Sequence, residues 1–112
     1  MVDGCLFCGI VAGSVPATVV YEDDAALAFL DVNPQAPTHV LVITREHLAD
    51  IVELAHDPLA GAALLNGIRA VADQLALTDF RTVFNTGAGV GQSVFHVHAH
   101  LLSGRPMTWP PG

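Results

Sequence analysis

The stretch His96-Val97-His98-Ala99-His100 places three of the chain's six histidines at alternating positions. Alternate residues of a β-strand point to one face, so three imidazole rings are expected to stand in a row, roughly 6–7 Å apart. The flanking residues Phe95, Val97, Ala99 and Leu101 are expected to face the other way, into apolar packing. Clusters of titratable side chains mark functional sites, so this stretch predicts a strand that carries chemistry.

The composition indicates one folded domain over residues 1–112. With 52% hydrophobic and 13% charged residues, the chain is not of the disordered class. The chain has no lysine, and four arginines against eleven acidic residues give a net charge of −7. This charge argues against binding a nucleic-acid polymer, which depends on neutralising many phosphates. A small phosphorylated ligand is compatible with it, because backbone N–H groups hold phosphate locally.

The sequence predicts a cytoplasmic protein with no membrane partner. Its first residues lack the basic and apolar segments of a signal peptide, and no run approaches the roughly 18–20 apolar residues of a membrane span. In such a chain, two cysteines are more typical of thiols or metal ligands than of a structural disulfide.

The remaining segments predict an α+β domain with about five mainly antiparallel strands, one long helix and a short N-terminal helix. The strands are expected over residues 18–22, 25–31, 39–44, 80–85 and 94–102. The 39–44 strand is nearly all apolar and is therefore expected to be central in its sheet. Short helical segments are expected over residues 5–12 and 46–54.

The long helix is expected over residues 58–77. Asp57 is a favourable capping residue, and Pro58 suits the first helical position. Apolar residues at three- and four-residue spacing predict one buried stripe along this helix, made of Leu64, Leu65, Ile68, Val71, Ala72 and Leu75.

Two kinds of chemistry fit the histidine row. Imidazoles two residues apart on a strand can bind one zinc ion, and a neutral imidazole can act as a nucleophile. The preceding segment, Asn85-Thr86-Gly87-Ala88-Gly89-Val90-Gly91-Gln92-Ser93, favours the nucleophile. Its glycines allow backbone N–H groups to approach anionic oxygens, and its polar side chains add neutral donors. A phosphate bound there would lie next to His98.

These segments resemble the histidine-triad (HIT) family, and within it the HINT-like branch of purine nucleoside phosphoramidases. The histidine row followed by Leu101-Leu102 matches the pattern in which histidines alternate with apolar residues. The other matching segments extend over nearly the whole chain: Tyr21-Glu22-Asp23-Asp24, Ala28-Phe29-Leu30-Asp31, Pro34-Gln35-Ala36-Pro37-Thr38-His39, Gly91-Gln92-Ser93-Val94 and Trp109-Pro110-Pro111-Gly112. Leu30 departs from the pattern, because close relatives often carry histidine there.

The resemblance implies a covalent mechanism. His98 would attack the α-phosphorus of a nucleoside monophosphate joined to an amine, and water would hydrolyse the nucleotidyl-histidine. His100 would assist at the phosphoryl oxygens, Ser93 would relay a proton to the amine, and His39 would support the network. Asp31 matches the carboxylate that accepts hydrogen bonds from the ribose hydroxyls. The other expected substrate contacts are Phe7, Ile10, Phe29, Val32, Asn85, Gly91 and Gln92.

A second motif, Cys5-Leu6-Phe7-Cys8, taken alone fits a redox pair, half of a metal site or coincidence. The resemblance pairs its cysteines with His47 and His96 in a structural zinc site. Four ligands of this kind suit tetrahedral zinc. His96 would then be a structural ligand and not a free catalytic acid or base.

The tail over residues 105–112 is rich in proline and cannot form a central strand. The resemblance implies a homodimer in which this tail reaches the partner protomer and Trp109 shapes the partner's leaving-group pocket. The expected function is hydrolysis of the P–N bond of adenosine or guanosine 5′-monophosphoramidates, including aminoacyl-adenylate-type substrates. The alternatives are a dinucleoside polyphosphate hydrolase, a zinc hydrolase that uses the histidine row, and a nucleotide-binding adaptor with vestigial activity.

Overall fold

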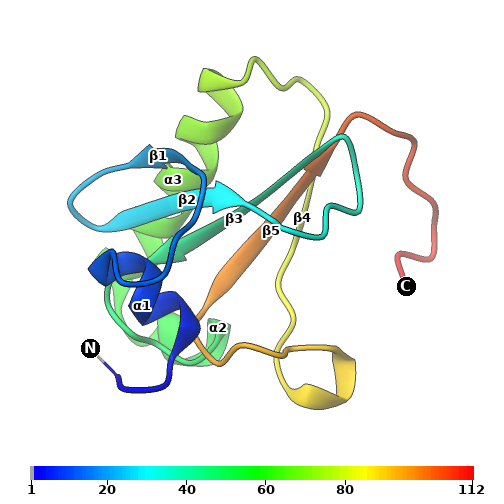
Figure 1. The fold of residues 1–112 in the computed structure, drawn as a ribbon. Helices are drawn as coiled ribbons and strands as arrows, with labels where there is room; N and C mark the ends of the chain where they lie inside the picture. The colour runs from blue at the N-terminus through cyan, green and yellow to red at the C-terminus, as the bar shows by residue number, and fades with distance from the viewer. Residues whose placement is uncertain (1) are drawn as a thin grey trace.

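The computed structural model describes residues 2–112 and shows a five-stranded antiparallel sheet between helices (Figure 1). Met1, the first residue of the expected domain, lies outside the described residues. The strands occur in the order β1-β2-β3-β5-β4. Their bounds are Val19–Glu22 for β1, Ala26–Leu30 for β2, Thr38–Thr44 for β3, Arg81–Val83 for β4 and His98–Ser103 for β5. The expected α+β class with five antiparallel strands is confirmed.

Two helices cover opposite faces of the sheet. The short helix α1 (Leu6–Ala12) lies in front of it in Figure 1, and the long helix α3 (Pro58–Gln74) lies behind it. Two shorter elements, α2 (Ile51–Ala55) and the 3-10 helix η1 (Ala88–Val90), occupy the connections. Among the described residues, no helix combines the length and hydrophobicity needed to cross a bilayer.

Alternation along the strands sends side chains into two separate cores. On one face, Val42 and Ala99 pack in the same cluster as Leu64 and Val71 of α3. On the other face, Phe29 and Ile43 pack with Phe7 of α1. The central strand β3 is buried on both faces, as its apolar sequence predicts. His98 and His100 alternate with Ala99 and Leu101, so their rings stand on the α1 face.

Helix α3 begins where the sequence predicts, because the Asp57 carboxylate accepts a hydrogen bond from the backbone N–H of Ala60 (3.0 Å). It ends at Gln74 rather than Leu77, before Ala76 takes a positive φ of 54°. The expected buried stripe is wrong at Leu75, which lies beyond the helix and is 37% exposed, and at Leu65, which is 64% exposed. Leu65 lies about 100° around the helix from Leu64, and a helix lying on one sheet buries only one side.

The second helix was expected to begin at residue 46, but it begins at Ile51. The carbonyl groups of the preceding segment have partners elsewhere: that of Glu46 accepts from Thr44 Oγ1, and that of Leu48 from the Val97 N–H. The Asp50 carboxylate then accepts from the N–H groups of Val52 and Glu53 and starts the helix. Hydrogen bonds from Thr44 and from the distant Val97 therefore hold residues 46–50 as a loop.

The last strand was expected over residues 94–102, but it begins at His98. Its first residue pairs with Ile43, one residue before β3 ends at Thr44. Beyond that point the sheet offers no neighbour on this side, and the His96 ring instead meets the Thr44 carbonyl. Phe95, expected to face apolar packing, is 51% exposed. The three histidines therefore do not form one continuous row on a strand.

Candidate active site and metal centre

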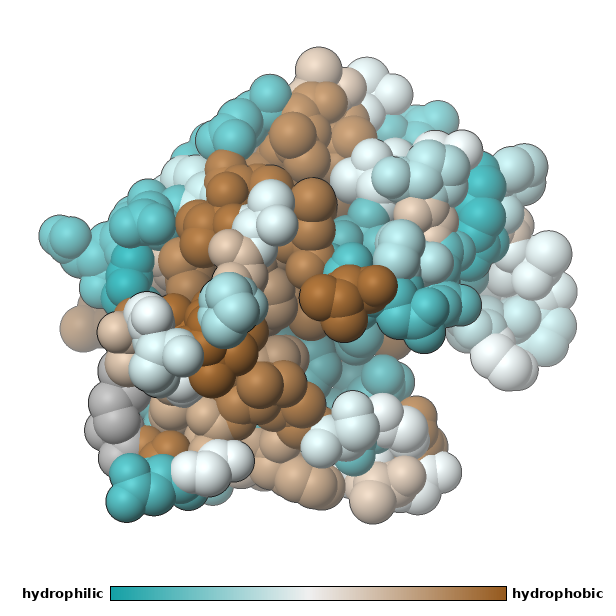
Figure 2. Space-filling view, viewed as in Figure 1, coloured by the Kyte–Doolittle hydropathy of each residue, from teal (hydrophilic) through white to brown (hydrophobic). Residues whose placement is uncertain are grey.

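A cleft of about 480 Å³ opens on the α1 face of the sheet, where the ends of β2 and β5 meet the glycine-rich loop. This volume is in the range of small-molecule sites. Figure 2 shows hydrophobic side chains gathered across this face, with more hydrophilic ones in the recess beside them. The cleft therefore has an apolar region next to a polar one that contains His98, His100 and Asp31.

Ten of the side chains and backbone positions expected to contact substrate or take part in chemistry line this cleft. They are Phe7, Ile10, Phe29, Asp31, Val32, Asn85, Gly91, Ser93, His98 and His100. They come from α1, β2, β5 and two loops. The packing of α1 on the antiparallel sheet thus brings together residues up to 93 positions apart, from Phe7 to His100.

Four other expected residues lie elsewhere. His39 is buried behind His100, and His96 is buried against the two cysteines. Trp109 is 83% exposed in the tail. Gln92 is 3% exposed and its amide is fully engaged: it accepts from the Gly87 N–H and donates to the carbonyls of Ala49 and Val94. Its side chain closes the loop instead of facing the cleft.

The sequence reasoning missed several lining residues, among them Pro16, Ala17 and Leu41. Leu41 pairs with His100 and lies two residues after His39, so strand alternation alone could have placed it on this face. Ala17 precedes β1, and the antiparallel β1–β2 pairing brings it beside the end of β2. Pro16 carried no comparable signal.

One hydrogen bond determines which nitrogen of His98 carries its proton. Nδ1 lies 2.8 Å from the backbone carbonyl oxygen of His96, which can only accept. Nδ1 is therefore protonated, and in the neutral ring the lone pair is on Nε2. Burial lowers the pKa of His98, while the hydrogen bond to His96 and the Asp31 charge oppose this shift. His98 thus offers a neutral imidazole with a free Nε2 in the cleft.

A second set of hydrogen bonds determines the tautomers of His39 and His100. The backbone N–H of Gln35 donates to His39 Nδ1 (3.0 Å), so the proton of His39 is on Nε2. That Nε2–H donates to His100 Nδ1 (2.9 Å) and lies 3.4 Å from Asp31 Oδ2. His100 therefore accepts at Nδ1 and carries its own proton on Nε2.

The rings of His39 and His100 are both neutral near neutral pH. Burial lowers the pKa of His39, and the nearby Asp31 carboxylate only partly opposes this effect. Burial, together with the charges that His98 and His39 would carry, lowers the pKa of His100 to about 4. Near neutral pH, His100 is therefore a neutral hydrogen-bond donor at Nε2.

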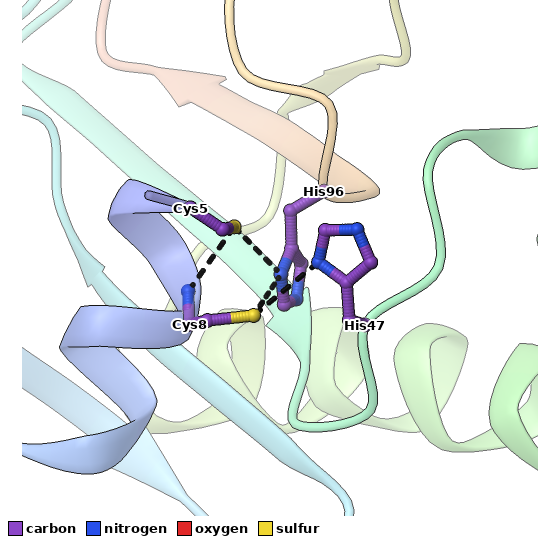
Figure 3. Close-up of side chains that lie close together, drawn as sticks. All are labelled: Cys5, Cys8, His47 and His96. Carbon is purple, nitrogen blue, oxygen red and sulfur yellow. Dashed lines mark hydrogen bonds between the residues drawn. The ribbon is translucent and has the colours of Figure 1, made fainter. Parts of the chain in front are cut away.

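Side chains from three segments converge in a separate cluster beside the cleft (Figure 3). Cys5 and Cys8 come from the start of α1, His47 follows β3, and His96 precedes β5. Cys8 Sγ lies 3.3 Å from His47 Nδ1 and 3.6 Å from His96 Nδ1, and Cys5 Sγ lies 3.6 Å from His96 Nδ1. The four ligand atoms all lie within 4.8 Å of one another.

The chemistry of this donor set fits zinc. His96 Nε2 lies 2.6 Å from the Thr44 carbonyl, so its proton is there and its Nδ1 lone pair faces the sulfur atoms. A metal-binding histidine commonly donates its other N–H to a carbonyl in this way. The Cys8 backbone N–H points at Cys5 Sγ (3.3 Å), an arrangement that favours a thiolate there. Burial raises the pKa of the Cys5 thiol, and a coordinated cation would reverse this shift.

The three rings of the histidine row do not converge on one point. His96 directs Nδ1 toward the cysteines, His98 uses Nδ1 on the His96 carbonyl, and His100 uses Nδ1 on His39. This geometry argues against a zinc hydrolase built on the row.

Comparisons with known proteins show the family to which this chain belongs. The pattern of the HIT domain family matches residues 12–107. An uncharacterized HIT-like protein from Synechococcus elongatus is 48% identical over 115 residues, which cover 100% of both chains. The 14 kDa zinc-binding protein of Zea mays is 46% identical over 112 residues, covering 96% of this chain and 87% of that protein. The chain belongs to the HIT domain family.

Solved structures give the same result. A HIT family hydrolase from Legionella pneumophila superimposes with a TM-score of 0.91 at 48% identity, covering 97% of this chain and 100% of that chain. A HIT family hydrolase from Clostridium thermocellum has a TM-score of 0.91 at 36% identity, covering 96% of each chain.

Proposed function

We propose that this protein is a HINT-like phosphoramidase that hydrolyses the P–N bond of adenosine or guanosine 5′-monophosphoramidates, including aminoacyl-adenylate-type substrates. The observation that carries the proposal is the His98–His96 hydrogen bond, which leaves the Nε2 lone pair in a cleft that His100 also lines. The similarity to proteins named HIT family hydrolases supports hydrolytic activity.

The proposed reaction has two displacements at phosphorus. His98 Nε2 attacks the α-phosphorus, the N–P bond to histidine forms, and the bond to the amine breaks. The amine departs with that electron pair and takes the proton of the Ser93 hydroxyl. Water then attacks the phosphorus and gives one proton back to the Ser93 oxygen, which releases the nucleoside monophosphate and returns the electron pair to His98 Nε2. The hydrogen bond from His98 Nδ1–H to the His96 carbonyl stabilises the positively charged imidazole of the intermediate between the two steps.

The other lining residues would position the substrate. The His100 Nε2–H would donate to a phosphoryl oxygen, and the backbone around Gly91, whose φ is +101°, would approach the same group. Asp31 would accept hydrogen bonds from the ribose hydroxyls. The apolar side chains of Phe7, Ile10, Phe29 and Val32 would contact the purine.

The Cys5, Cys8, His47 and His96 cluster is proposed to bind a structural zinc ion. The support is the donor set described above and the similarity to a protein named for zinc binding. When bound, zinc would cross-link α1 to the segment after β3 and the segment before β5, and it would supply no step of the chemistry.

A homodimer is proposed as the functional unit, with each tail over residues 105–112 reaching the partner and Trp109 shaping the partner's leaving-group pocket. Three features support it. β4 is an edge strand of the sheet, Leu65 on α3 is 64% exposed, and Trp109 is 83% exposed. An edge strand has backbone groups that a second chain can pair with, and exposed large apolar side chains can be covered by such a chain.

Intact-protein mass spectrometry tests the mechanism. The protein is mixed with adenosine 5′-monophosphoramidate, quenched rapidly in base because the histidine–phosphorus bond is acid-labile, and weighed. The wild type is expected to gain one adenosine monophosphate transiently, and His98→Ala is expected not to. His56→Ala removes an exposed histidine outside the cleft and serves as the matched control. No adduct on the wild type, or an equal adduct on His98→Ala, contradicts the covalent mechanism.

A further inference from the structure

The loop between β2 and β3, residues 31–37, lies against the first residues of the tail (Figure 1). Thr38, the first residue of β3, pairs with Ser103, the last residue of β5. The residues just outside the two strands, Pro37 and Gly104, therefore lie side by side. Gly104 has a φ of +98°, and a Cβ added there would lie 2.9 Å from Pro37 Cβ. The close approach of loop and tail therefore depends on glycine at position 104.

The next residue of the tail binds the same loop directly. Arg105 Nε donates to the backbone carbonyl of Gln35 (2.9 Å). The loop is also bonded internally, since Gln35 Nε2 donates to the Asn33 carbonyl (3.0 Å) and the Asn33 N–H donates to Asp31 Oδ1 (2.8 Å). Arg105 thus holds Gln35 from the tail side, while the loop's own bonds hold it from the β2 side.

Gln35 connects this contact to the active site. Its carbonyl accepts from Arg105, and its N–H donates to His39 Nδ1 (3.0 Å). The direction of that N–H is the reason why His39 is protonated at Nε2 and donates to His100 Nδ1. The series Arg105, Gln35, His39, His100 therefore runs from an exposed arginine to a ring that lines the cleft.

Turning the Gln35 N–H away from His39 Nδ1 would change the hydrogen bonding of the His39 and His100 rings. With no donor facing His39 Nδ1, only the Asp31 carboxylate, 3.4 Å from Nε2, still favours the proton on Nε2, and the tautomer protonated at Nδ1 becomes more populated. When Nδ1 carries the proton, Nε2 becomes an acceptor, and His100 must then donate from Nδ1. His100 Nε2 would then present a lone pair, which repels phosphoryl oxygens instead of binding them.

We propose that Arg105 is a positioning residue that, together with the close packing of Gly104 on Pro37, directs the Gln35 N–H at His39 and so keeps His100 in the tautomer that donates into the cleft. The effect on catalysis rests on the proposed phosphoramidase function, whereas the effect on the tautomers does not.

Nitrogen-15 NMR of the histidine rings tests the proposal without any substrate. In the wild type at neutral pH, His39 and His100 are expected to be protonated at Nε2 alone. Arg105→Met is expected to give a mixture of tautomers at both rings. Arg105→Lys, which keeps a charged N–H donor group, is expected to restore much of the wild-type signal. Arg69→Met is the control for the lost charge, because Arg69 pairs with Asp73 on the exposed side of α3.

Kinetics with a phosphoramidate give the second measurement. The loss of one transition-state donor predicts that Arg105→Met lowers kcat about tenfold or more with little change in KM, with partial rescue in Arg105→Lys. Unchanged tautomers in Arg105→Met, or a wild-type His39 protonated at Nδ1, overturn the proposal. If the tautomers shift but no variant, the wild type included, turns over the substrate, the positioning role stands and the proposed function fails.

Discussion

The backbone carbonyl oxygen of His96 lies 2.8 Å from Nδ1 of His98, while the side chain of the same His96 faces Cys5 and Cys8. One residue therefore joins the metal cluster through its ring and orients the proposed nucleophile through its backbone. The two sites are adjacent, and the structure of one supports the geometry of the other.

Removing the metal is expected to destabilise the protein. A ligand that binds only the folded state adds roughly 3 kcal/mol when present at about a hundredfold its dissociation constant, which for a domain of this size is on the order of 10 °C in Tm. The wild type is expected to contain about one zinc per chain by elemental mass spectrometry, and Cys8→Ser to lose it with a lower Tm. Thr78→Ala, at an exposed position between α3 and β4 and outside the metal cluster, serves as the control. Full zinc content in Cys8→Ser refutes the assignment.

His100 is expected to make stability depend on pH. Its pKa in the folded protein, about 4, lies below the ordinary histidine value of 6.5, so the unfolded chain binds more protons between these values. The stability contribution is therefore complete above pH 6.5 and is lost as the pH falls toward 4. Chemical denaturation across this range is expected to show a shallower decline for His100→Gln than for the wild type. An identical decline in both proteins contradicts the predicted shift.

Alanine at Gly67 and alanine at Gly61 are expected to change the stability of the protein in opposite directions. A Cβ on Gly67 would lie 3.0 Å from Val42 Cγ1 and 3.3 Å from Ala26 Cβ, so Gly67→Ala would push α3 from the sheet and cost about 1–3 kcal/mol. A Cβ on Gly61 meets only ordinary contact, with the Leu54 carbonyl at 3.8 Å, and Gly61→Ala would stabilise α3 by roughly 0.5–1 kcal/mol. Urea denaturation measures the free energy of unfolding of both variants. A change of the same sign in both contradicts the close packing of Gly67 on the sheet.

Asp31 is expected to discriminate between ribose and its deoxy analogues. A hydrogen bond to a carboxylate contributes about 1.5–3 kcal/mol, so Asp31→Ala is expected to lower kcat/KM for a ribonucleoside phosphoramidate about ten- to hundredfold. The same variant should show a much smaller loss with a 2′,3′-dideoxy substrate, which separates ribose contact from the nearby His39 interaction. Equal losses with both substrates contradict a ribose-binding role.

Local sequence features predicted most of the elements but not all of their ends. Asp57 and Pro58 mark the start of α3, and Cys5 and Gly13 cap α1, through hydrogen bonds within a few residues. The expected starts at residues 46 and 94 were wrong because these two segments bond to one another, for example from the Val97 N–H to the Leu48 carbonyl. Spacing within one segment contains no information about such partners.

The sequence by itself determined the residue types at the site and the face on which His98 and His100 stand, because strand alternation is a local property of the backbone. It also determined the apolar pattern that makes β3 central. Only the tertiary structure decided the tautomers of His98, His39 and His100, the direction of the His96 ring and the fully bonded Gln92 amide. Each of these depends on a hydrogen-bond partner brought close by antiparallel pairing or by a loop closing on a distant segment.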